Sequence, residues 1–333
     1  MSIKLSVLDQ SPLLPGATAR DALKQTTELA QWTDKLGYHR FWVSEHHSTK
    51  MLAGSAPEIL ITHLAAHTKH IRVGTGGVLL PHYSAYKVAE VFRVLESLYP
   101  GRIDLGVGRA PGGMPGVNYA LNKGKYPNVK EYPQQVQELM NYIRGGKHPT
   151  YQVSATPLGD TAPPIWMLGS STNSASLAAQ SGTSYTFAQF INGDGGIDAM
   201  KDYYEHFQPS AQQKEPQGSV AIFVVCAKTE EEAEYLASTL DLQLLRVENG
   251  DFRHEYPEPG EAMDYPYTPF ELERVRYNRQ RMIVGNPKQV KEQLEQLAQS
   301  YGVEEIIVNT IATSAEKRFE SYKLIMDAFQ EEV

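Results

Sequence analysis

The chain contains one cysteine, Cys226, among its 333 residues, so no disulfide bond can form within it. A cysteine-poor chain suits a reducing compartment, and we expect this protein in the cytoplasm. The N-terminal segment MSIKLSVLDQSP has too short an apolar run for a signal peptide, because Asp9 interrupts it. No stretch approaches the ~20 apolar residues of a membrane span, so we expect no membrane association.

Positive charge is also scarce. Lys and Arg number 31 against 39 Asp and Glu, which gives a formal net charge of −8. This balance disfavours nucleic acid or an anionic membrane as a partner. The sequence has no P-loop, and two glycine-rich stretches miss the G-x-G-x-x-G dinucleotide fingerprint, because Leu79 and Pro111 stand where the third glycine belongs.

What the sequence does contain is a regular alternation of two hydrophobic periods. Hydrophobic residues make up 41% of the chain and charged residues 21%, as in a globular protein. The strand-like segments are residues 3–8, 38–43, 71–80, 102–107, 164–168, 185–190, 220–226 and 305–308. The helical segments are residues 19–36, 57–67, 86–98, 134–143, 174–180, 230–245, 288–300 and 315–329.

Eight strands and eight helices in nearly regular alternation predict an α/β fold with a parallel sheet and outer helices. Eight such units close most naturally as a (β/α)8 TIM barrel, and an open doubly wound sheet is the alternative. We therefore expect one domain over residues 1–333. Two segments exceed a minimal barrel, residues 110–133 and residues 246–285, and we expect both to be loop insertions at the catalytic face, the second as a lid.

The stretch RFWVSEHHSTK places Glu45, His46 and His47 where the second strand ends. In a barrel the chain enters the mouth of the active site at this point. The intrinsic pKa of histidine lies near neutral pH, so His46 is a candidate general base, and Glu45 is a candidate to orient it or to bind a ligand. The alternative is one packed and one solvated histidine.

A metal site has weaker support. His63 and His67 lie four residues apart in HLAAH, but the glutamate of the HExxH motif is missing and an outer helix lies far from the mouth. We therefore expect no metal, although a barrel metallohydrolase using His46 and His47 is a rival hypothesis.

An anion site is indicated by PIWMLGSSTNSASLAAQSG, where an apolar strand runs into Gly169, Ser170 and Ser171 before a helix that contains Ser174. Glycine allows close approach, serine hydroxyls donate hydrogen bonds, and a helix N-terminus attracts anions, so this stretch predicts a phosphate cradle. Arg109, at the end of GRIDLGVGR, lies one strand away and can reach the same anion. Ordinary N-capping by serine is the alternative.

These stretches together resemble the bacterial-luciferase-like family of flavin-dependent monooxygenases. The resemblance extends over LSVLDQSP, LGYHRFWVSEHH, LAGSAPEI, IRVGTGGVLLPHY, GRIDLGVGR and the serine-rich stretch to VGNPKQVKEQLEQLAQSYGVEEIIVNT. It implies a (β/α)8 barrel that binds reduced FMN at the carboxyl ends of its strands. A non-prolyl cis peptide beneath the flavin falls on Gly76 and Gly77, which accounts for the glycines of the third strand.

The resemblance also implies roles for the other candidates. Arg109, Gly169, Ser170, Ser171 and Ser174 would bind the FMN phosphate, and His46 would transfer a proton between the flavin intermediate and the substrate. O2 would add to the flavin C4a atom, and the resulting peroxide would oxygenate a small organic molecule. A separate NAD(P)H:flavin reductase would supply the reduced FMN. Relatives pair through the helices at residues 57–67 and 86–98, so a homodimer or a higher even homo-oligomer is expected.

The chain departs from the light-emitting luciferase subunit at Gly108, where that subunit has cysteine, and at Ser170, where it has glutamate. We therefore expect neither light emission nor a long-chain aldehyde substrate. Two other readings stay open at this point. One is an F420-dependent hydride-transfer oxidoreductase of the same fold, and the other is a non-catalytic flavin-binding or storage protein.

Overall fold

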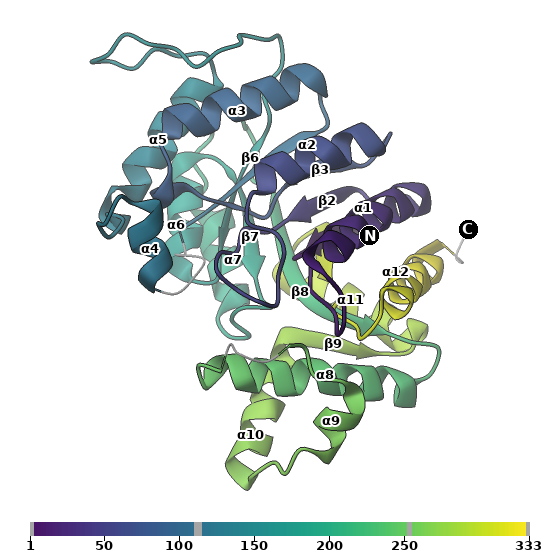
Figure 1. Cartoon of the computed structure of the whole chain (residues 1–333). Coiled ribbons are helices and arrows are strands. Elements are labelled where there is room, and N and C mark those ends of the chain that lie inside the picture. Colours follow the sequence, from purple (N-terminus) through teal and green to yellow (C-terminus); the bar gives the residue numbers. More distant parts are fainter. Residues whose placement is uncertain (1–2, 110–114, 252–254, 331–333) are drawn as a thin grey trace.

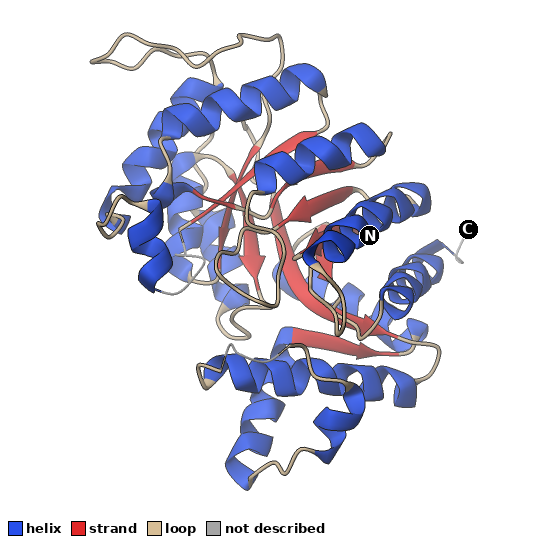
Figure 2. Ribbon diagram, viewed as in Figure 1, coloured by secondary structure: helices blue, strands red, loops and turns tan. Residues whose placement is uncertain are grey.

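A computed structural model describes residues 3–109, 115–251 and 255–330. The strands of the described residues form one parallel sheet (Figures 1 and 2). They are β1 (Lys4–Asp9), β2 (Arg40–Val43), β3 (Arg72–Thr75), β4 (Val78–Leu79), β5 (Ile103–Gly108), β6 (Ile165–Gly169), β7 (Ser184–Ala188), β8 (Gly218–Cys226), β9 (Met282–Gly285) and β10 (Glu305–Asn309). Because β10 pairs with both β1 and β8, the sheet closes into an eight-stranded barrel, and the predicted TIM barrel is confirmed.

Helices surround this barrel (Figure 2). The α-helices are α1 (Ala19–Leu36), α2 (Pro57–His67), α3 (Ala85–Leu98), α4 (Pro115–Leu121), α5 (Tyr132–Ile143), α6 (Thr172–Ser181), α7 (Gly196–Glu205), α8 (Glu230–Glu248), α9 (Pro259–Asp264), α10 (Pro269–Asn278), α11 (Pro287–Tyr301) and α12 (Ala315–Gln330). Short 3-10 turns are η1 (Leu80–His82), η2 (Val129–Glu131) and η3 (Arg279–Arg281). No helix in the described part of the chain is both long and apolar enough to span a bilayer.

The third strand differs from its prediction, because residues 71–80 form two short strands. β3 and β4 both pair with β5, and Gly76 and Gly77 interrupt the strand between them. Strand β9 was not predicted. It pairs with the carboxyl-terminal half of β8, from Phe223 to Cys226, outside the closed barrel. The sequence therefore predicted the barrel strands but not this extension.

Helix α1 illustrates why the sequence folds as it does locally. Thr18 precedes it, and its hydroxyl accepts a hydrogen bond from the Asp21 amide at 3.2 Å while the Asp21 carboxylate accepts from the Thr18 amide at 2.9 Å. This reciprocal capping box satisfies two of the free N–H groups at the helix start. Gly37 ends the helix with a φ of 87°, a left-handed conformation that favours glycine.

The interior of the barrel, beneath the carboxyl ends of the strands, contains buried charged side chains as well as apolar ones. Arg40 is 3% exposed and donates to Asp104 at 2.8 Å and to Glu305 at 2.5 Å. The indole of Trp42 donates to the same Asp104 carboxylate at 3.1 Å. Leu8, Trp42, Trp166, Ala221 and Ile307 form an apolar layer within the barrel. This layer, with Arg40 over the Trp166 ring, closes the space beneath the strand ends.

The two predicted insertions contain more regular structure than expected. Residues 115–133 hold α4, η2 and the start of α5, and residues 110–114 lie outside the described part. Residues 246–285 include the end of α8, α9, α10, η3 and β9, with residues 252–254 outside the described part. In Figure 1, α9 and α10 pack beside α8, away from the outer barrel helices. Their action as a lid stays a prediction.

Candidate functional site

A cavity of about 270 Å³, open to solvent, lies at the carboxyl ends of the barrel strands. Every barrel strand contributes to its wall, either directly or through the residues that follow the strand. This is the face at which TIM-barrel enzymes carry their active sites. The cavity wall has the residues Leu8, Gln10, Trp42, Ser44, Glu45, His46, Gly76, Gly77, Leu79, Gly108, Arg109, Leu168, Gly169, Ser170, Ser171, Ser174, Thr186, Ala188, Phe190, Ile191, Ala221 and Ile307.

All eight candidate residues from the sequence lie in this wall, although they come from positions 46 to 174. They are His46, Gly76, Gly77, Arg109, Gly169, Ser170, Ser171 and Ser174. The structure therefore brings together the whole predicted set, while the role of each residue remains a prediction.

One side of the cavity is built from the start of α6. Ser171 is the N-cap residue of this helix, and the Ser174 hydroxyl donates to the Ser171 carbonyl at 2.6 Å. The Tyr185 hydroxyl, on the neighbouring strand β7, lies 3.1 Å from Ser174 Oγ and 3.3 Å from the Ser171 carbonyl. Asn192 fixes the preceding turn by donating to the Ser170 carbonyl at 3.1 Å. The helix start is therefore held in place by neighbouring strands and loops.

Glycine is required where β6 meets this helix. A Cβ atom at Gly169 would lie 2.0 Å from Ser174 Oγ, far inside a van der Waals contact. Only glycine leaves room for the serine hydroxyl to fold back against the strand end. The close approach explains why the sequence GSS precedes the helix.

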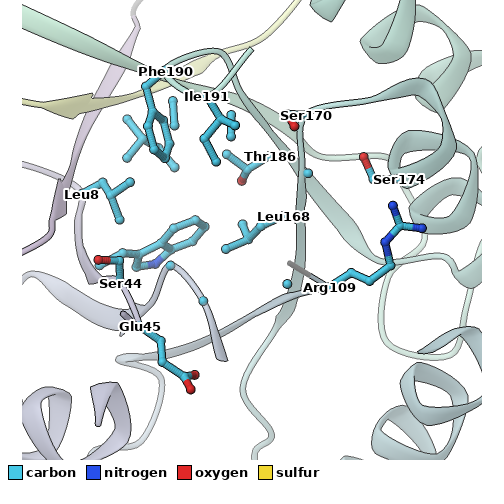
Figure 3. A pocket seen from close by; sticks show the side chains of 18 of the residues that line it. Leu8, Ser44, Glu45, Arg109, Leu168, Ser170, Ser174, Thr186, Phe190 and Ile191 are labelled. Carbon is cyan, nitrogen blue, oxygen red and sulfur yellow. The ribbon is translucent and has the colours of Figure 1, made fainter. Parts of the chain in front are cut away.

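Arg109 faces the same side of the cavity. Figure 3 shows its side chain extended from the end of β5 toward Ser174. The residue is exposed, and no described residue forms an ion pair or hydrogen bond with its guanidinium. A guanidinium without a partner among these residues, beside serine hydroxyls and a helix N-terminus, is suited to bind a phosphate group.

The base of the cavity is formed by bare backbone. The peptide bond between Gly76 and Gly77 is cis, as the family resemblance implied. A Cβ atom at Gly76 would lie 2.7 Å from Leu8 Cδ1, and one at Gly77 would lie 2.7 Å from the Gly106 carbonyl oxygen. The absence of side chains leaves a flat backbone surface on which a planar ring can rest.

His46 lines the same cavity as this surface and is partly buried. Its Nδ1 atom lies 3.0 Å from Ser44 Oγ, and its backbone amide donates to the Gly54 carbonyl at 2.8 Å. Burial, helped by the nearby His47, lowers the pKa of His46 to about 4. The imidazole is therefore neutral at pH 7 and can accept a proton.

Glu45 does not orient His46, contrary to one of the two roles proposed from the sequence. Its carboxylate instead accepts hydrogen bonds from the Leu79 amide at 2.8 Å, the Tyr83 hydroxyl at 2.6 Å and His47 Nε2 at 2.7 Å. These three bonds tie the end of β2 to β4 and η1, next to the glycine pair. Ser44 takes the orienting position that the sequence gave to Glu45.

The metal alternative receives no support from the described residues. No group of three or more His, Cys, Asp or Glu side chains in that part of the chain is arranged to hold a metal ion. His47 is engaged with Glu45, and the rings of His63 and His67 on α2 lie 4.1 Å apart, tilted by 36°.

The other side of the cavity is apolar and was not predicted from the sequence. Leu8, Phe190 and Ile191 lie across the cavity from Arg109 in Figure 3. Strand periodicity could have identified Leu8 as an inward-facing residue. Phe190 shares its strand face with Thr186 and Ala188, so the alternation of the predicted strand 185–190 could have identified it as well. Ile191 lies in the polar stretch INGDGG, where no period marks a side chain as cavity-facing.

The residues present fit the FMN that the resemblance implies. The phosphate site consists of the Arg109 guanidinium, three serines at a helix N-terminus and a glycine whose Cβ would fill the cradle. The flat glycine surface and the apolar layer of Trp42 and Leu168 suit a planar aromatic ring. The anion site and the surface for the ring belong to the wall of the same cavity.

Comparison with known proteins gives a consistent result. The model of the family described as "Luciferase-like monooxygenase" matches residues 1–305. The chain is 53% identical to the uncharacterized protein YwcH of Bacillus subtilis, over 98% of this chain and 99% of that protein. It is 38% identical to the N-acetyl-S-alkylcysteine monooxygenase of the same organism, with 98% of each chain covered.

Among solved structures, the chain is similar to the crystal structure of apo-MsnO8. The TM-score is 0.91 at 38% sequence identity, and the match covers 98% of each chain. The two proteins therefore share one fold over almost their full length.

Proposed function

The chain belongs to the luciferase-like monooxygenase family, and from that premise we propose that it is an FMN-dependent monooxygenase that uses reduced flavin and O2 to oxygenate a small organic substrate. The observation that carries this proposal is the continuity of three features in one cavity. These are the anion cradle at Arg109 and Ser174, the bare backbone of Gly76 and Gly77, and the neutral imidazole of His46.

Each feature has one task in this proposal. Arg109, Ser170, Ser171 and Ser174 bind the phosphate, and Tyr185 holds the serines in place. When bound, reduced FMN activates O2 so that one oxygen atom passes to the substrate and the other leaves as water. The protein itself binds, orients and excludes water.

Proton transfer falls to His46. Its Nδ1 is engaged by Ser44, and none of the described residues forms a hydrogen bond with Nε2, which is left to exchange a proton inside the cavity. The apolar side, with Leu8, Phe190 and Ile191, keeps water from the substrate.

The reduced flavin would come from a separate NAD(P)H:flavin reductase, because neither glycine-rich stretch of this chain has the dinucleotide fingerprint. We place the enzyme in the cytoplasm, where its one free, buried thiol, Cys226, stays reduced. A homodimer through α2 and α3 is consistent with three exposed apolar residues on these helices, Ile59, Val94 and Leu98.

The name of one relative suggests where to look for a substrate. N-acetyl-S-alkylcysteines carry an apolar alkyl thioether, and the apolar side of the cavity offers a surface for such a group. These thioethers are the first compounds to test.

The proposal is tested by mixing the protein anaerobically with reduced FMN and then with oxygenated buffer in a stopped-flow spectrophotometer. We expect a transient near-ultraviolet absorption that outlasts the oxidation of free reduced FMN. Oxidation at the rate of free flavin, with no binding of reduced FMN, would contradict the proposal.

The same preparation distinguishes the rival readings. Binding of F420 in preference to FMN would indicate the hydride-transfer alternative. Tight binding of oxidised FMN, with reduced FMN reacting with oxygen as free flavin does, would indicate a storage protein.

A further inference from the structure

The Phe190–Ile191 segment forms one wall of the cavity but is not fixed by sheet pairing. It follows the last residue of β7, and the Ile191 amide donates to the Ala188 carbonyl at 3.0 Å in a turn. The Phe190 amide donates to the Ala221 carbonyl at 3.1 Å, and its ring packs edge-on against Phe223 at 5.4 Å. These contacts hold the inner side of the wall.

The outer side of this wall is held by the insertion. Arg281 Nε donates to the Phe190 carbonyl at 2.9 Å, and the Gln189 side chain donates to the Gln280 carbonyl at 2.8 Å. The Tyr277 hydroxyl donates to Asp194 at the other end of the same loop. Three residues of α10 and η3, namely Tyr277, Gln280 and Arg281, therefore contact the loop at residues 189–194.

Arg281 is in turn held by a carboxylate of α8. Its NH1 group donates to Glu248 at 3.1 Å, and the Arg281 side chain is only 14% exposed. Glu248 also accepts from Arg274 at 2.7 Å and from Asn278 at 3.1 Å. Although burial opposes it, hydrogen bonds from Arg274 and Asn278 keep the pKa of Glu248 below its ordinary value, so the carboxylate stays charged.

We propose that Arg281 is a positioning residue that holds the Phe190–Ile191 wall from behind, so that the insertion sets the width of the substrate side of the cavity for compact apolar groups. The proposal rests on the proposed function in one respect: FMN takes the side with Arg109, which leaves the side with Phe190 and Ile191 to the substrate. Arg281 touches neither ligand and acts only through the Phe190 carbonyl.

The arginine is suited to this role because its planar group donates from two nitrogens at fixed angles. Nε binds the Phe190 carbonyl and NH1 binds the Glu248 carboxylate. A shift of α8 or η3 therefore moves the Phe190–Ile191 wall. A lysine supplies one point donor and can restore only part of the geometry.

The test compares wild-type protein with Arg281→Met, Arg281→Lys and the control Arg276→Met. Arg276 is an exposed arginine of α10 for which no contact to the wall is found among the described residues. Isoleucine δ1 methyl groups are labelled, and the Ile191 resonance is followed by NMR in the absence of flavin. Two uncharged apolar probes of different width, cyclohexanol and 1-adamantanol, are then titrated.

In Arg281→Met we expect the Ile191 methyl resonance to shift, and the affinity ratio of wide to narrow alcohol to rise about fivefold or more, in line with the discrimination of apolar pockets. Arg281→Lys should recover part of both effects, and Arg276→Met neither. The dissociation constant of reduced FMN should change by less than about twofold, because Arg281 does not contact the phosphate side.

Three results would overturn the proposal. They are an unchanged Ile191 resonance in folded Arg281→Met, an unchanged affinity ratio, and a wild-type Ile191 resonance that neither alcohol shifts. Failure of wild-type protein to bind reduced FMN would instead contradict the proposed function, and the flavin-free methyl comparison separates the two cases. Should Arg281→Met not fold, Arg281→Lys still decides by the same measurements.

Discussion

Ser44 Oγ lies 3.0 Å from Nδ1 of His46 at the end of β2. A neutral imidazole has one donor and one acceptor nitrogen, so the role that Nδ1 takes toward the hydroxyl fixes the opposite role for Nε2. The Ser44 hydroxyl can donate or accept, so it orients the ring of His46 in either tautomer. The adjacent Glu45 does not take this position, because its oxygens accept from Leu79, Tyr83 and His47.

The first prediction concerns proton transfer. Replacing His46 by Gln should lower the rate of product formation from an accepted substrate by about 10²–10⁴-fold, the usual size of an acid–base contribution. The dissociation constant of reduced FMN should stay within about twofold of wild type, since the phosphate side is untouched. Steady-state product analysis and flavin titration measure the two quantities.

Ser44→Ala is the companion variant and should reduce the rate less, because the imidazole remains. If His46→Gln turned over as fast as wild type while binding flavin normally, the proton would have to move through another group.

The second prediction concerns pH and stability. Burial and His47 lower the pKa of His46 to about 4 from an ordinary 6.5, so between these values the unfolded chain binds a proton that the folded protein does not. The contribution of His46 to the free energy of unfolding is therefore present above pH 6.5 and falls as the pH drops toward 4, by at most about 1.4 kcal/mol per pH unit.

Urea unfolding of wild type and His46→Gln at a series of pH values between 4 and 7 measures this loss. The wild-type curve should fall more steeply with decreasing pH than that of the variant, and parallel curves would show that His46 titrates normally.

The sequence was sufficient for those parts of the fold and site that are local. Gly76 and Gly77, the GSS turn and Arg109 each stand beside a strand whose hydrophobic period is clear, so their position at the barrel mouth follows from the βα alternation. The same alternation predicted α1 and α2 with the bounds that the structure shows.

The sequence did not predict elements that lack a hydrophobic period of their own. Helix α7 begins after NGDGG, where asparagine, aspartate and glycine favour turns. Residues 269–278 bury only Asn278, so α10 has no apolar stripe to reveal it. Arg281 donates to the Phe190 carbonyl from 91 residues later in the chain, and no spacing rule links two such positions.

The third prediction isolates the phosphate contact. Arg109→Met should weaken FMN binding by about 10–100-fold, the value of a charge-assisted hydrogen bond to an anion. Riboflavin has the same ring without the phosphate, so its affinity should change little. Isothermal titration with both flavins at two salt concentrations measures the difference, and equal losses for FMN and riboflavin would place Arg109 at the ring instead.

The fourth prediction concerns the glycine of the cradle. In Gly169→Ala the new Cβ would lie 2.0 Å from Ser174 Oγ and 2.3 Å from Ser174 Cβ, so the start of α6 must shift. We expect FMN affinity to fall about tenfold or more through loss of aligned serine donors. Gly116→Ala is the matched control, because nothing lies within 4 Å of its added Cβ. Unaltered FMN affinity in folded Gly169→Ala would show that Ser174 does not bind the phosphate.

The last prediction concerns the charges beneath the cavity. Arg40 is buried between Asp104 and Glu305, and both carboxylates are also at most 4% exposed in their side chains. Arg40→Met removes the cation that they share and leaves buried negative charge with fewer partners, which should cost about 3–5 kcal/mol of unfolding free energy. Arg72 still donates to Asp104 at 2.6 Å, but among the described residues only Ser6 remains as a side-chain donor to Glu305.

Lys24→Met provides the control, since the Lys24–Glu28 pair on α1 is 74% and 46% exposed and should contribute less than about 0.5 kcal/mol. Chemical denaturation of both variants at pH 7 gives the comparison. Because the Trp42 indole binds the same Asp104 carboxylate, a loss of stability in Arg40→Met should be accompanied by weaker flavin binding above it. Destabilisation without any change in flavin affinity would show that the charge layer supports the barrel and not the cavity base.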